Sequence, residues 1–83
     1  MDTKSHDNHE TDYTVNDEPE VTTEKVLTPT QIMTGAGIDA ATNYLIELIG
    51  NTQKSFQGKP DAEIHMHPKM SFITSFTGPT PVA

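Results

Sequence analysis

The chain has 83 residues, a formal net charge of −7 at pH 7 and an isoelectric point near 4.7. A chain of this length forms one domain at most, and no apolar run approaches the ~20 residues of a membrane-spanning helix. Cysteine and arginine are both absent. Their absence excludes disulfides and thiol catalysis and disfavours nucleic-acid binding, which depends on neutralising phosphates. Since no signal-peptide pattern is visible, we expect a small cytoplasmic protein without a cofactor.

The negative charge is concentrated at the N-terminal end. Residues 1–25 hold eight acidic residues and two lysines, so six of the seven net negative charges lie there. Residues 2–12 contain no apolar side chain, and such a stretch buries too little surface to offset the entropy of ordering. We therefore predict a disordered acidic tail over 1–12, a folded domain over 13–76 and a flexible tail over 77–83.

The folded part begins with residues that favour a hairpin. Residues 13–15 are aromatic and β-branched, which predicts a strand with Tyr13 and Val15 on one face. Residues 16–19 have the composition of a turn. The threonine-rich segment 20–27 then predicts a second strand.

A helix start follows directly. Thr28 at the N-cap and Gln31 three residues later form a capping-box pattern. Pro29 suits the first helical position, because its fixed φ fits a helix and its missing N–H has no helical partner there. The apolar stripe of this helix consists of Ile32, Met33 and Ala36. Gly35 or Gly37 is expected to end it.

The second half of the chain predicts more strands. A turn capped by Asp39 is expected over 39–43, and Gly50-Asn51 is a hairpin signal. Strands are predicted over 44–49, 53–56 and 70–76. In the last strand, alternation places Met70, Phe72, Thr74 and Phe76 on one face. Residues 57–69 are expected to form loops or one 3₁₀ turn, so the fold class is α+β, with one helix on a mixed sheet.

Several of these segments resemble bacterial multiubiquitin-type ubiquitin-like proteins, which are encoded beside E1-like, E2-like and peptidase proteins. The resembling segments are residues 27–39, 43–45, 54–60, 72–73 and 77–82. The resemblance as a whole covers about residues 13–82, nearly the whole chain except the acidic tail. The resemblance implies a ubiquitin-like β-grasp fold, in which the first and last strands lie adjacent and parallel at the centre of the sheet.

The resemblance also implies a function as a protein modifier, which is a substrate of enzymes and not itself an enzyme. A peptidase trims the C-terminus of such a protein, an E1-like enzyme activates the carboxylate, and an E2-like enzyme passes it to target proteins. Operons of this type are associated with anti-phage defence. Two other functions stay open for this chain, a non-conjugated β-grasp interaction module and a sulfur carrier.

A modifier needs a thin C-terminal segment of small residues that enters an active site. Gly78, preceded by Thr77, lies in the right region just beyond the predicted last strand. The sequence departs from a Gly-Gly ending, and Pro79 makes the following bond a tertiary amide, which most peptidases cleave poorly. Our hypothesis is that residues 79–83 are removed and that Gly78 becomes the reactive end. A mature end slightly further along is the alternative.

Three other groups of residues are candidate sites. Lys4 is the most accessible acceptor if chains of modifiers form, and four other lysines could also serve; they are Lys25, Lys54, Lys59 and Lys69. His65 and His67 have the spacing of two metal ligands, but without a clear third ligand they are interpreted as surface histidines. Three apolar residues, Ile46, Leu48 and Ile73, are expected either to form a docking patch or to complete the core.

Overall fold

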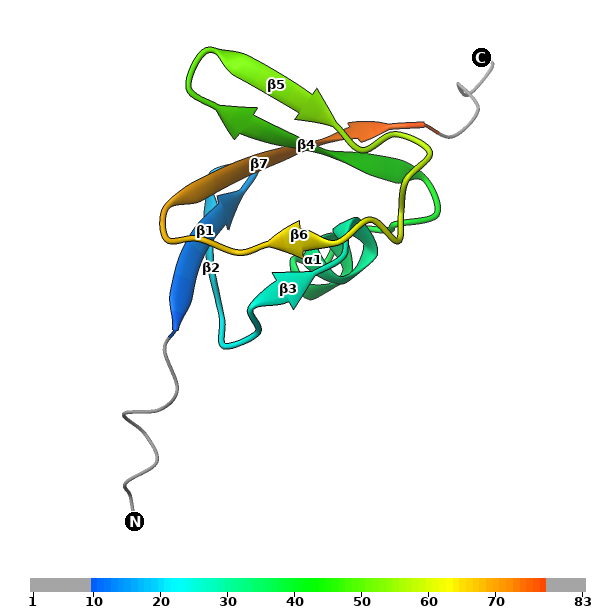
Figure 1. Ribbon diagram of the computed structural model, residues 1–83. Helices are drawn as coiled ribbons and strands as arrows, with labels where there is room; N and C mark the ends of the chain where they lie inside the picture. The colour runs from blue at the N-terminus through cyan, green and yellow to red at the C-terminus, as the bar shows by residue number, and fades with distance from the viewer. Residues whose placement is uncertain (1–9, 78–83) are drawn as a thin grey trace.

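The computed structural model describes residues 10–77, which form seven strands and one helix (Figure 1). In chain order these are β1 (Thr11–Val15), β2 (Glu18–Thr22), β3 (Val26–Leu27), α1 (Pro29–Gly35), β4 (Asn43–Ile49), β5 (Thr52–Ser55), β6 (Ile64–His65) and β7 (Met70–Phe76). Five strands form one sheet in the order β2-β1-β7-β4-β5. Only the β1–β7 pair in it is parallel. The fold is therefore α+β and β-grasp-like, as expected.

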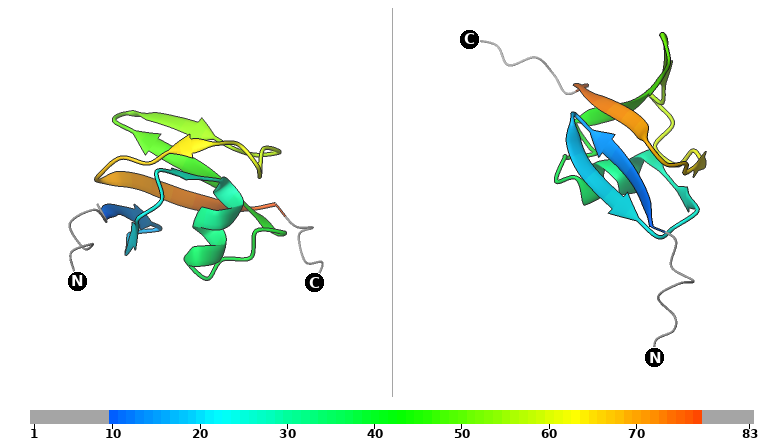
Figure 2. Two further views of the ribbon diagram at one scale, coloured as in Figure 1. Left: turned by 60° about the horizontal axis from the view of Figure 1, so that its bottom comes forward. Right: turned by 90° about the vertical axis from the view of Figure 1, so that its left-hand side faces the viewer.

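The core lies between the sheet and a layer made of α1 and the β3–β6 pair, which occupy the same side of the sheet (Figure 2). At its centre, the ring of Tyr13 on β1 meets that of Phe72 on β7 edge to face, with centroids 5.9 Å apart. The most deeply buried side chains are Phe72, Ile32, Met33, Leu45 and Val15. Tyr13 and Val15 share the core face, as their spacing predicts.

The helix follows its sequence signals closely. The backbone N–H of Gln31 donates to Thr28 Oγ1, and the N–H of Thr28 donates to Gln31 Oε1, so the predicted capping box is confirmed. Gly37, with φ +79°, ends the helix. There the N–H of Ile38 donates to the carbonyl of Met33 over 2.8 Å, a bond from beyond the helix back to its last turn that is typical of a glycine-ended helix. Among residues 10–77, no helix is long and apolar enough to cross a bilayer.

The N-terminal boundary of the domain differs from the prediction. Strand β1 begins at Thr11, so the predicted tail over 1–12 is wrong at its end, where Thr11 and Asp12 pair with Thr22 and Val21 of β2. These polar residues can join the sheet because backbone pairing does not require apolar side chains. In addition, the N–H of Lys69 donates to the carbonyl of Asp12. Residues 1–9 lie outside the described part.

The predicted strand over 20–27 is also corrected. The hairpin turn consists of two residues only, Asn16 and Asp17, both with positive φ, so β2 begins at Glu18. Pro19 is accommodated because β2 is an edge strand, which need not donate there. After Thr22 the chain leaves the sheet, and residues 26–27 pair with β6 instead. Strand β6 lies in a region predicted as loop, because only its two residues pair with β3 and so short a strand has no pattern in the sequence.

Candidate functional site

The first candidate site is the carboxyl end of β7, just before the last described residue, Thr77. Strand β7 lies at the centre of the sheet, between β1 and β4. Its last residue, Phe76, is paired with Asn43 at the start of β4. The N–H of Thr77 then donates to the carbonyl of Thr42 over 2.6 Å. The backbone is thus held in place up to the residue before Gly78.

A turn built on Asp39 holds the acceptor of that bond. The carboxylate Oδ1 of Asp39 accepts the N–H of Ala41 over 2.9 Å, and the Asp39 carbonyl accepts the N–H of Thr42 and the side-chain amide of Asn43. The predicted turn at Asp39 is therefore confirmed. It fixes the Thr42 carbonyl beside β7 and so holds the backbone of Thr77, the last described residue, in place.

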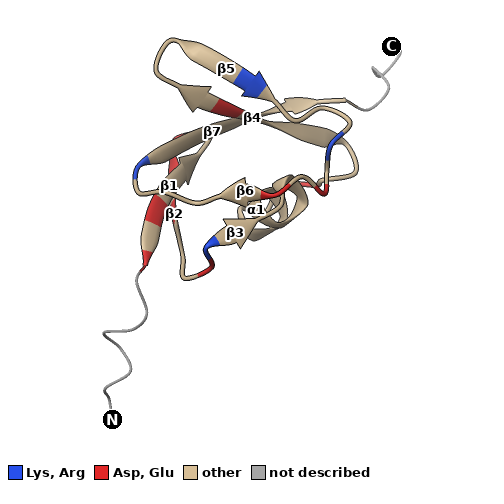
Figure 3. Cartoon of the chain, in the orientation of Figure 1, with Lys and Arg blue, Asp and Glu red and all other residues tan. Residues whose placement is uncertain are grey.

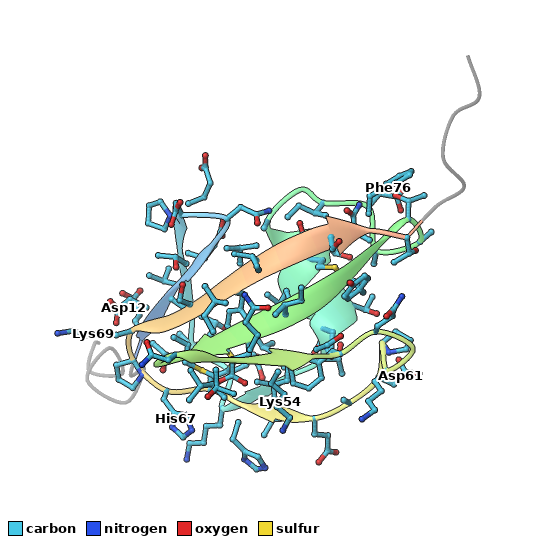
Figure 4. All side chains as sticks on the ribbon, turned by 90° about the horizontal axis from the view of Figure 1, so that it is seen from above. Asp12, Lys54, Asp61, His67, Lys69 and Phe76 are labelled. Atoms are coloured by element: carbon cyan, nitrogen blue, oxygen red, sulfur yellow. The ribbon has the colours of Figure 1, made fainter. Side chains whose placement is uncertain are left out.

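Phe76 stands at this exit with an exposed aromatic ring. Its side chain is 56% exposed, whereas Phe72, four residues earlier on the same face, is fully buried. Figure 4 shows Phe76 at the far end of β7, away from the core. Alternation predicted the face of Phe76 correctly but gave no sign of its exposure. The available signal was its place at the last residue of the strand, before a proline-rich segment.

Only part of the predicted conjugation site falls within the described residues. Thr77 is exposed at the end of the described chain, beside Phe76. Gly78 and Pro79, the predicted reactive end and cleavage site, lie outside the described residues, as does the predicted acceptor Lys4. These assignments stay predictions. What the structure adds is the position from which the C-terminal segment starts.

The described lysines lie among acidic residues. Acidic residues occur on β1, β2 and the turn between them, and also on β4 and near β3 and β6, where lysines lie close to them (Figure 3). Lys54 on β5, for example, is directly opposite Glu47 on β4. All four described lysines, Lys25, Lys54, Lys59 and Lys69, are exposed. The Lys54 ammonium lies 5.4 Å from the centroid of the Phe56 ring, a cation–π arrangement. Each of the four is sterically accessible as an acceptor.

A small pocket of about 200 Å³ lies where β4 and β5 approach β6. It is lined by Glu47, Lys54, Phe56, Glu63, Ile64, His65, His67 and Met70. Charges of both signs line this pocket, so they select no single ligand. His65 and His67 are both exposed. Among residues 10–77, no three histidine, aspartate or glutamate side chains are grouped to hold a metal ion.

The side of the sheet opposite α1 carries an apolar patch at its centre. Ile46 on β4 and Ile73 on β7 are directly opposite each other in the ladder. Both alternate with fully buried residues, so they point away from the core, and both are only partly buried. Tyr44 and Leu48 share the face of Ile46 and are also partly buried. The predicted patch residues therefore do not complete the main core.

Two surfaces are thus candidates for function, the exit of the chain at Phe76 and the open sheet face around Ile46 and Ile73. Comparisons of this chain with protein-family models, with curated proteins and with solved structures give no match. What the molecule does is therefore inferred from its own residues.

Proposed function

We propose that this protein is a ubiquitin-like modifier, whose C-terminal carboxylate is activated by an E1-like enzyme and transferred by an E2-like enzyme to target proteins. The observation that supports this most is the arrangement of β1 and β7. The last strand lies parallel to the first at the centre of the sheet and delivers the chain to an exposed edge of the fold at Phe76 and Thr77. The segments that resemble bacterial multiubiquitin-type proteins support the same function.

In this proposal the protein is a substrate, and its contribution is a carboxylate that enzymes can enclose. Attack of the carboxylate on the α-phosphate of ATP forms an acyl adenylate and releases pyrophosphate. An enzyme thiol then displaces AMP and forms a thioester. A nucleophile of the target finally displaces the thiol and leaves a covalent conjugate. A peptidase of the same operon trims the precursor, with Gly78–Pro79 as the predicted cleavage site, and the setting is anti-phage defence.

The open face of the sheet favours a second candidate, a non-conjugated interaction module. Ile46, Ile73 and Leu48 form a partly exposed apolar patch that the core does not use. Apolar side chains at the centre of a polar surface are typical of protein interfaces. The two candidates differ in one respect, because only the modifier requires a free C-terminal carboxylate.

The test is co-expression of this protein with the E1-like, E2-like and peptidase genes that the resemblance places beside it, followed by intact mass spectrometry. Removal of C-terminal residues together with adducts on other proteins supports the modifier. A full-length mass without adducts, with the enzymes shown to be active, leaves the interaction module. Exchange of oxygen for sulfur at the C-terminus, without adducts, would indicate the sulfur carrier instead.

A further inference from the structure

The carboxyl end of β7 has backbone groups that point away from β4. The N–H of Thr77 donates to the carbonyl of Thr42, which makes these two residues a hydrogen-bonded pair of the β4–β7 ladder. In an antiparallel ladder, hydrogen-bonded and non-hydrogen-bonded pairs alternate. The N–H and C=O of Phe76 therefore point to the other side of β7, toward the position that β1 would fill if it were longer.

Strand β1 ends before it reaches this position. The register aligns Val15, its last residue, with Phe72. Beyond it, Asn16 supplies the next partners, because its N–H donates to the carbonyl of Phe72 and its Oδ1 accepts the N–H of Thr74. The C=O of Thr74 and both backbone groups of Phe76 lie past that point. On the side of β1, the backbone groups of the last residues of β7 are therefore not paired with β1.

An exposed aromatic side chain stands beside this open edge. Phe76 is 56% exposed, and it is the only aromatic among the large apolar side chains found exposed within residues 10–77. Buried aromatic residues often dominate the energy of a protein interface. An extended segment added to a strand edge gains main-chain hydrogen bonds, while pockets for alternate side chains give specificity. An unpaired strand edge and an exposed aromatic side chain thus occur together, directly before the C-terminal segment.

We infer that the activating enzyme holds this protein by placing an extended segment of its own beside residues 74–76 and by burying the Phe76 ring in an apolar pocket. This inference rests on the proposed function as a modifier. It assigns a positioning function to Phe76, which lies two residues before Gly78 and takes no part in the chemistry. Bound in this way, the segment beyond Thr77 is aimed into the active site before the carboxylate reacts.

The experiment measures ATP–pyrophosphate exchange by the purified E1-like enzyme over a range of concentrations of this protein. Phe76→Ala is compared with Val21→Ala, which truncates a side chain of 61% exposure on β2, at the edge of the sheet. We expect Phe76→Ala to lower kcat/KM at least about tenfold, mainly through KM, and Val21→Ala to stay within about twofold of the wild type. Phe76→Tyr, which keeps the ring, is expected to restore most of the loss.

A third variant tests the backbone contact. Phe76→Pro removes the N–H that points away from β4, and it is expected to lower kcat/KM further than Phe76→Ala. Thermal unfolding of each variant shows whether the fold is kept. Equal kinetics for Phe76→Ala and Val21→Ala would overturn the inference while leaving the modifier function intact. Absence of exchange with the wild-type protein would overturn both.

Discussion

Asn16 and Thr74, 58 residues apart in the chain, are joined by two hydrogen bonds. The side-chain amide of Asn16 donates to Thr74 Oγ1 over 2.9 Å, and its Oδ1 accepts the backbone N–H of Thr74 over 3.0 Å. The side chain thereby takes the place of one more residue of β1 after the main chain has turned into β2. The hairpin turn is thus fixed to the central strand.

Replacing Asn16 with alanine should destabilise the fold. The change removes both side-chain bonds, each worth about 0.5–1.5 kcal/mol. It also places alanine at a φ of +53°, which asparagine tolerates better. We expect a loss of about 2 kcal/mol in the free energy of unfolding, measured by urea denaturation.

The neighbouring turn residue provides the matched control. Asp17 also has positive φ, at +68°, but its side chain makes no such contact with β7 among the described bonds. Asp17→Gly should therefore stabilise the protein by a few tenths to about 1 kcal/mol. Asp17→Ala also places alanine at a positive φ but removes no bond to β7, so it should lose less stability than Asn16→Ala. Equal losses for these two alanine variants would show that the bonds to Thr74 contribute nothing.

Local signals predicted the parts of the fold that depend on neighbouring residues. The capping box of Thr28 and Gln31, the turn at Asp39 and the alternation in β7 all depend on residues within a few positions of one another. Strand β6 could not be predicted in this way, because Ile64 and His65 become a strand only through pairing with residues 26–27, almost 40 positions earlier. The extension of β1 to Thr11 has the same cause.

The same distinction, between features set by neighbouring residues and features set by distant pairing, applies to the candidate site. The sequence placed Thr77 just beyond the last strand, and the structure agrees. Alternation alone does not predict the exposure of Phe76, because it places Phe72 and Phe76 on one face although only Phe72 is buried. The open edge beside Phe76 depends on where β1 ends relative to β7, which is a property of the register.

Lys69 is a second position where glycine should stabilise the protein. It follows Pro68 in the turn before β7 and has a φ of +66°, the conformation that favours glycine at this position of a type II turn. Since its side chain is exposed, we expect Lys69→Gly to raise the free energy of unfolding by about 0.5–1 kcal/mol. Lys59→Gly, at an exposed loop position without positive φ, should lower it by a similar amount. Thermal melts of the two variants should move in opposite directions.

Tyr13 should make the fold sensitive to high pH. Burial, and secondly the charge of Glu20, raise the pKa of the Tyr13 phenol above its ordinary value of 10.0. The unfolded chain therefore releases this proton at lower pH than the folded protein. The contribution of the neutral Tyr13 phenol to the free energy of unfolding is fully present below pH 10.0, and it is lost as the pH rises through the pKa of the folded protein. Tyr13→Phe should lose less stability than the wild type over this range in urea titrations. Parallel losses would show that Tyr13 is not responsible.

The two faces of β7 should respond differently to truncation. Phe72 is fully buried against Tyr13, so Phe72→Ala should cost about 3–5 kcal/mol, because it leaves a cavity in the core. Ile73, the next residue, lies on the open face and is only partly buried. Ile73→Ala, and likewise Ile46→Ala on β4, should each cost about 1 kcal/mol.

Urea denaturation of the three variants measures the contrast. A loss of several kcal/mol for Ile73→Ala would mean that the open face is part of the stabilising core. The expected small loss leaves Ile46 and Ile73 free to act in binding. In that case the double variant Ile46→Ala/Ile73→Ala separates the two proposed functions. A modifier that is bound through residues 74–76 and its C-terminal segment keeps its ATP–pyrophosphate exchange, whereas an interaction module that binds through the open face loses its partner.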